Sequence, residues 1–135
     1  MVMEIFEVFD EAEIINVYDV GVKTAYSAGE GKYNEILASW NKMIDGAHDM
    51  PAYGVSLDNL TRNELKSGLW VEFEFGRALE CNGMPFEKLL IQVDKEFQGF
   101  NLIRYNTGYG YDGRCFYFDL NGKNMGNFHD LLLNL

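Results

Sequence analysis

The sequence is poor in the residue types that stabilise small folds or carry out chemistry. It has two histidines, two cysteines and two prolines among 135 residues. Two cysteines do not make a disulfide framework in a chain of this length. Cys115 stands in an apolar run, which is typical of a small core residue. This cysteine usage predicts a reducing, cytoplasmic compartment.

Basic residues are also scarce. Eleven Lys and Arg face twenty-one Asp and Glu, which leaves a formal net charge of −10. Such a chain repels nucleic-acid phosphate and anionic membranes and attracts cations. No apolar run approaches the roughly 20 residues that span a bilayer. The expected partner is therefore a cationic small molecule or a basic protein, with neither nucleic acid nor a membrane bound.

Recognisable catalytic and metal-binding motifs are missing. His48 and His129 each precede an aspartate, but neither belongs to an HxxxH pattern, and the two cysteines form no CxxC pattern. The Gly108–Gly110 run lacks the further glycine and the following helix of a dinucleotide-binding turn. We therefore expect no metal and no cofactor. Binding is favoured over catalysis, and a carboxylate-based enzyme stays an alternative.

The composition predicts one folded domain over residues 1–135. Hydrophobic residues make up 47% of the chain and aromatic residues 15%, so the chain has enough apolar side chains for a core. The first segment, Met3–Phe9 and then Glu13–Tyr26, is rich in Ile, Val and Tyr. It predicts one or two strands with a turn near Asp10–Ala12.

An amphipathic helix is the clearest element in the sequence. Gly29 and Gly31 precede it, and Asp45-Gly46 follow as a natural end. Its apolar residues recur with helical spacing and should pack on the strands. These residues are Tyr33, Ile36, Leu37, Trp40, Met43 and Ile44.

The rest of the chain predicts an α+β fold with a mainly antiparallel sheet, packed against one long amphipathic helix and a short C-terminal helix. We expect each proline, Pro51 and Pro85, to stand just before a strand. The remaining expected elements are a short strand at Ala52–Leu57, a helical turn within Asp58–Gly68, a strand at Leu69–Phe75, a strand or helix at Phe86–Val93, a hairpin of Phe100–Tyr105 with Cys115–Leu120, and a helix capped by Asn124.

The strand at Leu69–Phe75 carries the main candidate site. Its alternation places Trp70, Glu72 and Glu74 on one face. Three interpretations are open: a solvated sheet face, a glycosidase-like carboxylate pair, or a cleft in which an aromatic wall and carboxylates bind a cationic, partly apolar ligand. In the third, Tyr53 on the preceding strand joins the site.

Four short stretches resemble the gyrase-inhibitor-like (AraC-type effector-binding) domains. They are a Gly-x-Tyr turn before a Trp-bearing helix at Gly31–Trp40, a YGVS strand within Ala52–Leu57, the acidic strand at Gly68–Phe75, and the run Cys115–Gly122. The resemblance implies an aromatic cleft with an acid inside that binds cationic or amphipathic small molecules. It adds Trp40 and Tyr117 to the candidate ligand-binding residues.

A second hypothesis is a small acidic inhibitor, such as an immunity or anti-defence protein, that binds a basic protein. Acids of the first segment would form one negative edge that steers association. Tyrosines of the glycine-rich loop Asn106–Arg114 would serve as interface anchors, and this loop could also act as a lid. The acids are Glu4, Glu7, Asp10, Glu11 and Glu13, and the tyrosines are Tyr105, Tyr109 and Tyr111.

Overall fold

The computed structural model describes residues 4–51 and 54–135. Its helical elements are η1 (Val8–Glu11), α1 (Gly31–Ile44), α2 (Asp58–Glu64) and α3 (Gly126–Leu133). Its strands are β1 (Ile14–Asp19), β2 (Val22–Ser27), β3 (His48–Met50), β4 (Val55–Ser56), β5 (Leu69–Cys81), β6 (Met84–Val93), β7 (Gly99–Tyr105), β8 (Gly113–Arg114) and β9 (Phe116–Asp119).

The described strands form one large sheet and one small one. The large sheet has the order β2-β1-β5-β6-β7-β9-β3, and β4 pairs with β8 in the small one. Every strand pairing is antiparallel. The predicted α+β class with a mainly antiparallel sheet is confirmed.

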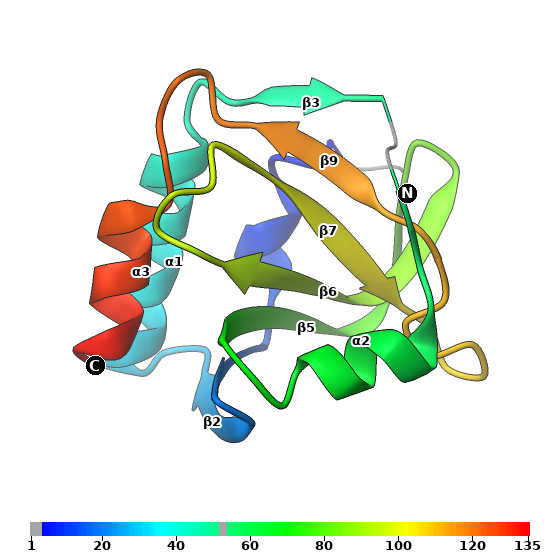
Figure 1. Ribbon diagram of the computed structural model, residues 1–135, viewed down its shortest axis with the longest axis horizontal. Coiled ribbons are helices and arrows are strands. Elements are labelled where there is room, and N and C mark those ends of the chain that lie inside the picture. The colour runs from blue at the N-terminus through cyan, green and yellow to red at the C-terminus, as the bar shows by residue number, and fades with distance from the viewer. Residues whose placement is uncertain (1–3, 52–53) are drawn as a thin grey trace.

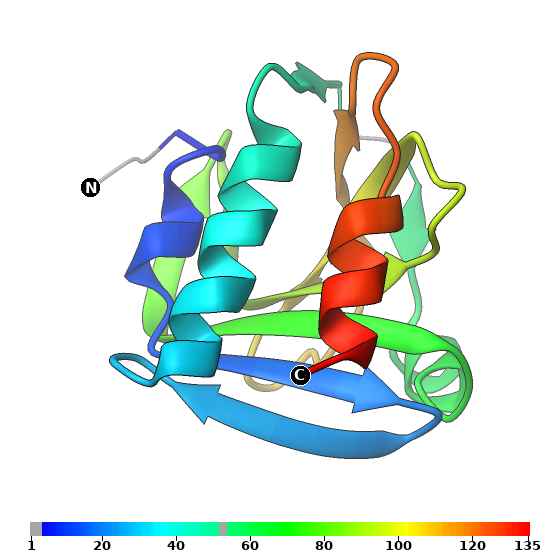
Figure 2. The ribbon, with the colours of Figure 1, turned by 90° about the vertical axis from the view of Figure 1, so that its left-hand side faces the viewer.

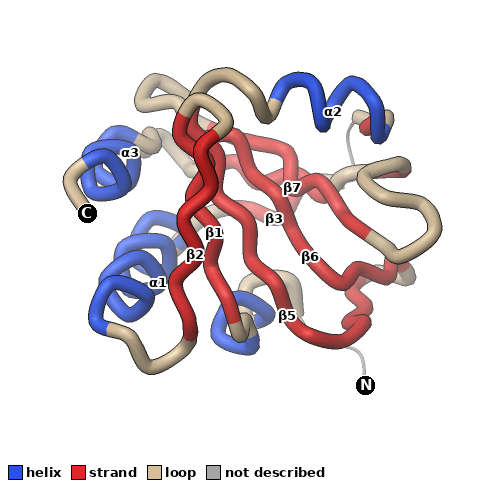
Figure 3. Tube along the Cα trace, turned by 90° about the horizontal axis from the view of Figure 1, so that it is seen from below, coloured by secondary structure: helices blue, strands red, loops and turns tan. Residues whose placement is uncertain are grey.

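Helices lie on both faces of the large sheet. Figure 2 shows α1 and α3 side by side against one face. The short helix α2 lies apart from them at the other side of the strands (Figures 1 and 3). The sheet therefore has two packed faces, and a side chain that points away from the main core does not automatically reach water.

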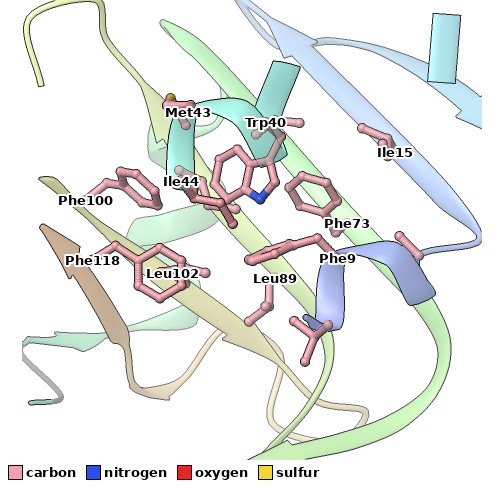
Figure 4. Packing of buried hydrophobic residues seen from close by; sticks show 14 of the residues in the cluster. Phe9, Ile15, Trp40, Met43, Ile44, Phe73, Leu89, Phe100, Leu102 and Phe118 are labelled. Atoms are coloured by element: carbon pink, nitrogen blue, oxygen red, sulfur yellow. The ribbon is translucent and has the colours of Figure 1, made fainter. Parts of the chain in front are cut away.

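The main core lies between the sheet and α1, with Trp40 at its centre (Figure 4). The indole ring packs 4.9 Å from Phe9, 5.0 Å from Phe73 and 5.3 Å from Phe100, measured between ring centroids. Trp40 is fully buried, and its Nε1 has no hydrogen-bond partner among the described residues. The predicted packing of the amphipathic helix on the apolar face of β5 is confirmed.

The prediction of a strand before residue 10 is wrong where the structure describes it, from Glu4 on. The segment forms turns and then the 3-10 helix η1. Ile5, Val8, Phe9 and Ala12 are all buried, and their i, i+3, i+4, i+7 spacing is helical. The alternating residues that follow form the two strands β1 and β2.

The turn between these strands was also placed wrongly. It lies at Val20-Gly21, between the paired residues Asp19 and Val22, and not at Asp10–Ala12. Val20 and Gly21 have positive φ values of 49° and 81°. A two-residue hairpin needs such backbone angles because they match the twist of the strands. Gly21 adopts its angle freely, whereas the β-branched Val20 is strained there.

The strand predicted at Leu69–Phe75 is longer in the structure, because β5 runs on to Cys81 through an irregularity between Glu74 and Leu79. The ambiguous Phe86–Val93 segment is a strand, part of β6. Pro85 lies inside β6 rather than before it. Pro51 comes directly after β3. Of the short strand predicted at Ala52–Leu57, β4 forms over Val55–Ser56, and residues 52 and 53 lie outside the described residues.

The second half of the chain follows the prediction closely. The strands β7 and β9 pair with each other, as expected for the long hairpin. The helix α2 occupies most of the polar stretch that was expected to hold a helical turn. Asn124 lies two residues before α3, where its Oδ1 accepts a hydrogen bond from the backbone N–H of Gly126. The short strands β3 and β8 were not predicted.

Candidate functional site

A second, smaller cluster covers the sheet face opposite to the main core. Trp70 on β5, Leu90 on β6 and Tyr111 in the loop after β7 are its buried members. The helix α2 and the loop between β7 and β8 lie over it. Partly buried side chains pack around these three: Tyr18, Leu65, Ile103 and Tyr105.

Glu72 lies in this cluster and is completely buried. Its Oε2 accepts a hydrogen bond of 2.5 Å from the hydroxyl of Tyr111. Its Oε1 accepts from the amide of Asn16 at 3.2 Å and from the hydroxyl of Tyr18 at 3.3 Å. Burial of a carboxylate without such donors costs free energy, so the hydrogen bonds from these three residues stabilise Glu72 at this buried position.

Glu74 lies two residues further along the same face and is partly exposed. The amide nitrogen of Asn16 donates to Glu74 as well as to Glu72, so one side chain on β1 joins the two carboxylates. The Nζ of Lys88 lies 3.7 Å from Glu74 Oε1 and 4.7 Å from the ring centroid of Tyr105. Lys88 on the neighbouring strand β6 thus supplies the positive charge that balances Glu74.

The tyrosine hydroxyls keep their protons in this environment. Burial, and then the charge of Glu72, raise the pKa of both Tyr18 and Tyr111. A protonated hydroxyl can donate, whereas a phenolate would meet the carboxylate as a like charge. Each hydroxyl therefore acts as a neutral donor to Glu72.

The loop after β7 and the helix α2 are fastened to each other. Asp58 at the start of α2 accepts a 2.9 Å hydrogen bond from the backbone N–H of Tyr111, and its own N–H donates to Asp112 Oδ1 at 2.7 Å. The Tyr111 N–H and then the Arg62 guanidinium hold the pKa of Asp58 below its usual range. Since Tyr111 also reaches Glu72, it links α2, the loop and the sheet.

The outer surface of this assembly is hollowed between α2 and the loop. The hollow has a volume of about 770 Å³ and is open to solvent. Leu57, Leu60 and Tyr109 contribute apolar surface, with exposed fractions of 56%, 59% and 73%. Asp58 and Asp112 line the same hollow. We call this feature the α2 hollow.

A second, smaller hollow of about 280 Å³ is lined by residues of β5, β6, β7 and β9. Trp70 and Tyr117 both border it, together with Glu64 from the end of α2. Trp70 is only 2% exposed, and its Nε1 donates to the carbonyl of Ser67 at 3.0 Å. This hollow is thus bordered by more aromatic residues than the α2 hollow, but by one carboxylate, Glu64, instead of two.

The structure brings together some of the candidate residues chosen from the sequence. Trp70, Glu72 and Glu74 share one face, as predicted, and Trp70 and Tyr117 border one hollow. The interpretation of that face as solvated is wrong at Glu72 and Trp70, because α2 and the loop after β7 cover these two side chains. Trp40 lies in the main core on the opposite face.

Tyr53 lies outside the described residues.

The remaining residues of the network were not assigned to this site from the sequence, and Tyr111 was named only as an interface anchor of the inhibitor hypothesis. Asn16 interrupts the apolar run Ile14–Val17, and a polar residue in such a run signals a buried hydrogen bond. Asp58 and Arg62 stand at i, i+4, the spacing of a helical ion pair. The role of Tyr111 had no sequence signal, because it depends on a loop folding back over a strand 39 residues away.

In the described part of the chain, no helix is both long and apolar enough to cross a membrane. The same residues contain no group of three or more His, Cys, Asp or Glu side chains that could hold a metal ion. Comparison of the chain with protein-family models, curated proteins and solved structures finds no match, and so none of them shows the gyrase-inhibitor-like family.

Proposed function

We propose that this chain is a non-catalytic binding protein that takes up a cationic, partly apolar small molecule in the α2 hollow. The observation that supports this most is the composition of the hollow, in which exposed apolar side chains lie beside the carboxylates of Asp58 and Asp112. Ligand sites commonly combine apolar walls with a few placed polar groups.

The two parts of such a ligand have separate partners. Leu57, Leu60 and Tyr109 offer the apolar body a surface that is otherwise in contact with water, and burial of that surface favours binding. Asp112 and the nearby Asp58 neutralise the positive charge. The net charge of −10 also raises the local concentration of cations around the protein.

The buried network supports this site from below. Tyr111 carries the backbone N–H that orients Asp58, and its hydroxyl is tied to Glu72 on the sheet. In this proposal Glu72 holds the wall of the hollow in place and does not touch the ligand. This differs from direct contact of Glu72 with a cation, which its complete burial does not favour.

A thermal-shift panel tests the proposal. Cationic aromatic dyes should raise the melting temperature, and neutral or anionic analogues of the same size should not. A ligand at 100 times its dissociation constant adds about 2.7 kcal/mol to the free energy of unfolding. Asp112→Asn keeps an oxygen that accepts the hydrogen bond from the backbone N–H of Asp58, but it removes the negative charge. We expect this substitution to weaken binding of the cationic dyes about tenfold.

Asp10→Asn is the matched control. Asp10 is also exposed and also accepts one hydrogen bond through Oδ1, in its case from Asn41 at 3.0 Å, but it belongs to η1 and not to the hollow. It should leave dye binding within twofold. Equal losses in the two variants, or equal binding of cationic and neutral dyes, would contradict the proposed site.

A basic protein is the second candidate partner. The supporting observation is that the acids of the first segment, Glu4, Glu7, Asp10, Glu11 and Glu13, are all exposed. Exposed charge of one sign speeds association with a partner of opposite sign. Here a basic protein that co-purifies should be released by high salt, and Glu7→Lys with Asp10→Lys should abolish its binding while Asp112→Asn leaves it unchanged.

A further inference from the structure

A cation of this chain already occupies part of the α2 hollow. Arg62, which lines it, places its Nε 2.9 Å from both carboxylate oxygens of Asp58. Its Cζ lies 5.3 Å from the ring centroid of Tyr111. A guanidinium that meets a carboxylate at one side and an aromatic ring at another has the two contacts by which proteins hold such groups.

We propose that the α2 hollow is specific for guanidinium ligands and that Arg62 is its internal competitor. The inference rests on the proposed function, because it concerns the same hollow. A ligand guanidinium takes the place of the Arg62 guanidinium on Asp58, and the apolar body of the ligand lies against Leu60 and Tyr109. In the free protein Arg62 lowers the apparent affinity of the site.

Displacement of Arg62 is feasible because its hold on the site is weak. Its side chain is 54% exposed, and Asp58 lies one helical turn before it on α2. Exposed ion pairs of this kind contribute little, since water and salt screen them and a long side chain must be ordered. The Arg62 side chain can therefore move into solvent at low cost.

Asp58 keeps its orientation when Arg62 leaves. The backbone N–H of Tyr111 donates to Oδ1 of Asp58, and the backbone N–H of Asp58 is bound by Asp112. Neither bond involves Arg62. The carboxylate that receives the ligand is thus preorganised by α2 and the loop, so that binding does not have to order it.

The geometry favours a guanidinium over an ammonium. One nitrogen of Arg62 contacts both oxygens of Asp58, and the Cζ of the planar group lies over the Tyr111 ring. An ammonium is a compact, strongly hydrated charge that lacks the planar, more weakly hydrated face of a guanidinium. A ligand that ends in an ammonium can meet the carboxylate through its single nitrogen, but it loses the contact of a planar group with the Tyr111 ring.

Three probes with the same apolar body test this inference: phenethylguanidinium, phenethylammonium and the neutral phenethylurea. Titration calorimetry on the full chain compares the wild type with Arg62→Ala. Phenethylguanidinium should bind Arg62→Ala about fivefold more tightly, which corresponds to the loss of a weak surface ion pair. Phenethylammonium should gain by a similar factor, because it meets the same competitor on Asp58, but it should bind each protein more weakly than phenethylguanidinium does. The urea should not bind either protein.

Arg77→Ala is the control for charge alone. Arg77 is also exposed, at 61%, and forms an ion pair of 3.0 Å with Glu11, away from the hollow. It should leave the affinity for every probe within twofold. Arg62→Gln, which keeps most of the side-chain stem, should reproduce the gain if Arg62→Ala loses stability.

The outcomes separate this inference from the proposed function. If phenethylguanidinium binds the wild type but Arg62→Ala and Arg62→Gln leave the affinity unchanged or reduce it, Arg62 is no competitor and the binding function stands. Equal gains in the Arg62 and Arg77 variants, or equal affinities of the two cations for the same protein, also overturn the inference. If neither these probes nor the cationic dyes bind any variant, the proposed function fails with it.

Discussion

The hydroxyl of Tyr111 should contribute more to the stability of this protein than most other single side-chain groups. It donates at 2.5 Å to Oε2 of Glu72, and both residues are buried. The other two donors to Glu72, Asn16 and Tyr18, both reach Oε1. In Tyr111→Phe, Oε2 therefore has no donor left among the described residues. Hydrogen bonds to charged groups contribute about 1.5–3 kcal/mol, and we expect a loss in this range.

The substitution changes little else. A phenylalanine ring keeps the edge contact with Tyr105, whose centroid lies 5.0 Å away, and the backbone N–H still donates to Asp58. Urea denaturation followed by tryptophan fluorescence gives the free energy of unfolding, and an unchanged slope shows that the denatured state is the same. Tyr109→Phe is the control, because Tyr109 is 73% exposed and its hydroxyl should contribute less than about 0.5 kcal/mol.

The same hydroxyl predicts a pH dependence. The pKa of Tyr111 is raised above its usual value of 10.0, by burial first and by Glu72 second. The folded protein therefore holds this proton more tightly than the unfolded chain. The stabilisation is complete below pH 10 and is lost as the pH rises beyond it, so the difference between wild type and Tyr111→Phe should shrink above pH 10. A Tyr111→Phe loss below 0.5 kcal/mol at pH 7 would refute the buried-acceptor argument.

Three further predictions concern the rest of the fold. Val20→Asn should raise the free energy of unfolding by about 1 kcal/mol, because Asn adopts the positive φ of this exposed turn at lower cost; a drop in the urea midpoint would contradict it. Trp40→Ala should cost about 3–5 kcal/mol, and a loss below 1 kcal/mol would show that the indole is not central to the core. Cys81, whose pKa is raised to about 11 by burial first and by nearby acids second, should resist iodoacetamide at pH 8 until the protein unfolds; rapid labelling of the folded protein, followed by mass spectrometry, would show that it is accessible.

Local patterns were enough to predict the elements whose side chains repeat regularly. The stripe from Tyr33 to Ile44 places the six large apolar residues on one side of a helix, and α1 forms over the expected residues. The alternation from Leu69 to Phe75 does the same for the start of β5. In both cases the period of the sequence matches the period of the structure, so neighbours in sequence carry the information. The pair Asn82-Gly83 between β5 and β6, both with positive φ, is a further local signal of a hairpin.

Local patterns gave a wrong prediction where the composition of a segment fits both a strand and a helical turn. The apolar residues around Ile5 and Phe9 suit a strand or a helical turn, and their burial against the main core selects the helical spacing. Sequence alternation also placed Glu72 correctly on the face away from Phe73. The alternation could not predict whether that face is exposed to water, because its exposure depends on how α2 and the loop after β7 pack against it.

The sequence by itself therefore determined the charge, the α+β class, the long helix and the shared face of Trp70, Glu72 and Glu74, because each of these is a property of composition or of local periodicity. Only the tertiary structure decided that Glu72 is buried beneath Tyr111, that Asp58 meets the loop after β7, and that Arg62 lies over the ring of Tyr111. These contacts join residues as many as 54 positions apart. They form because covering the second face of the sheet removes apolar side chains from water, and that gain depends on the whole fold.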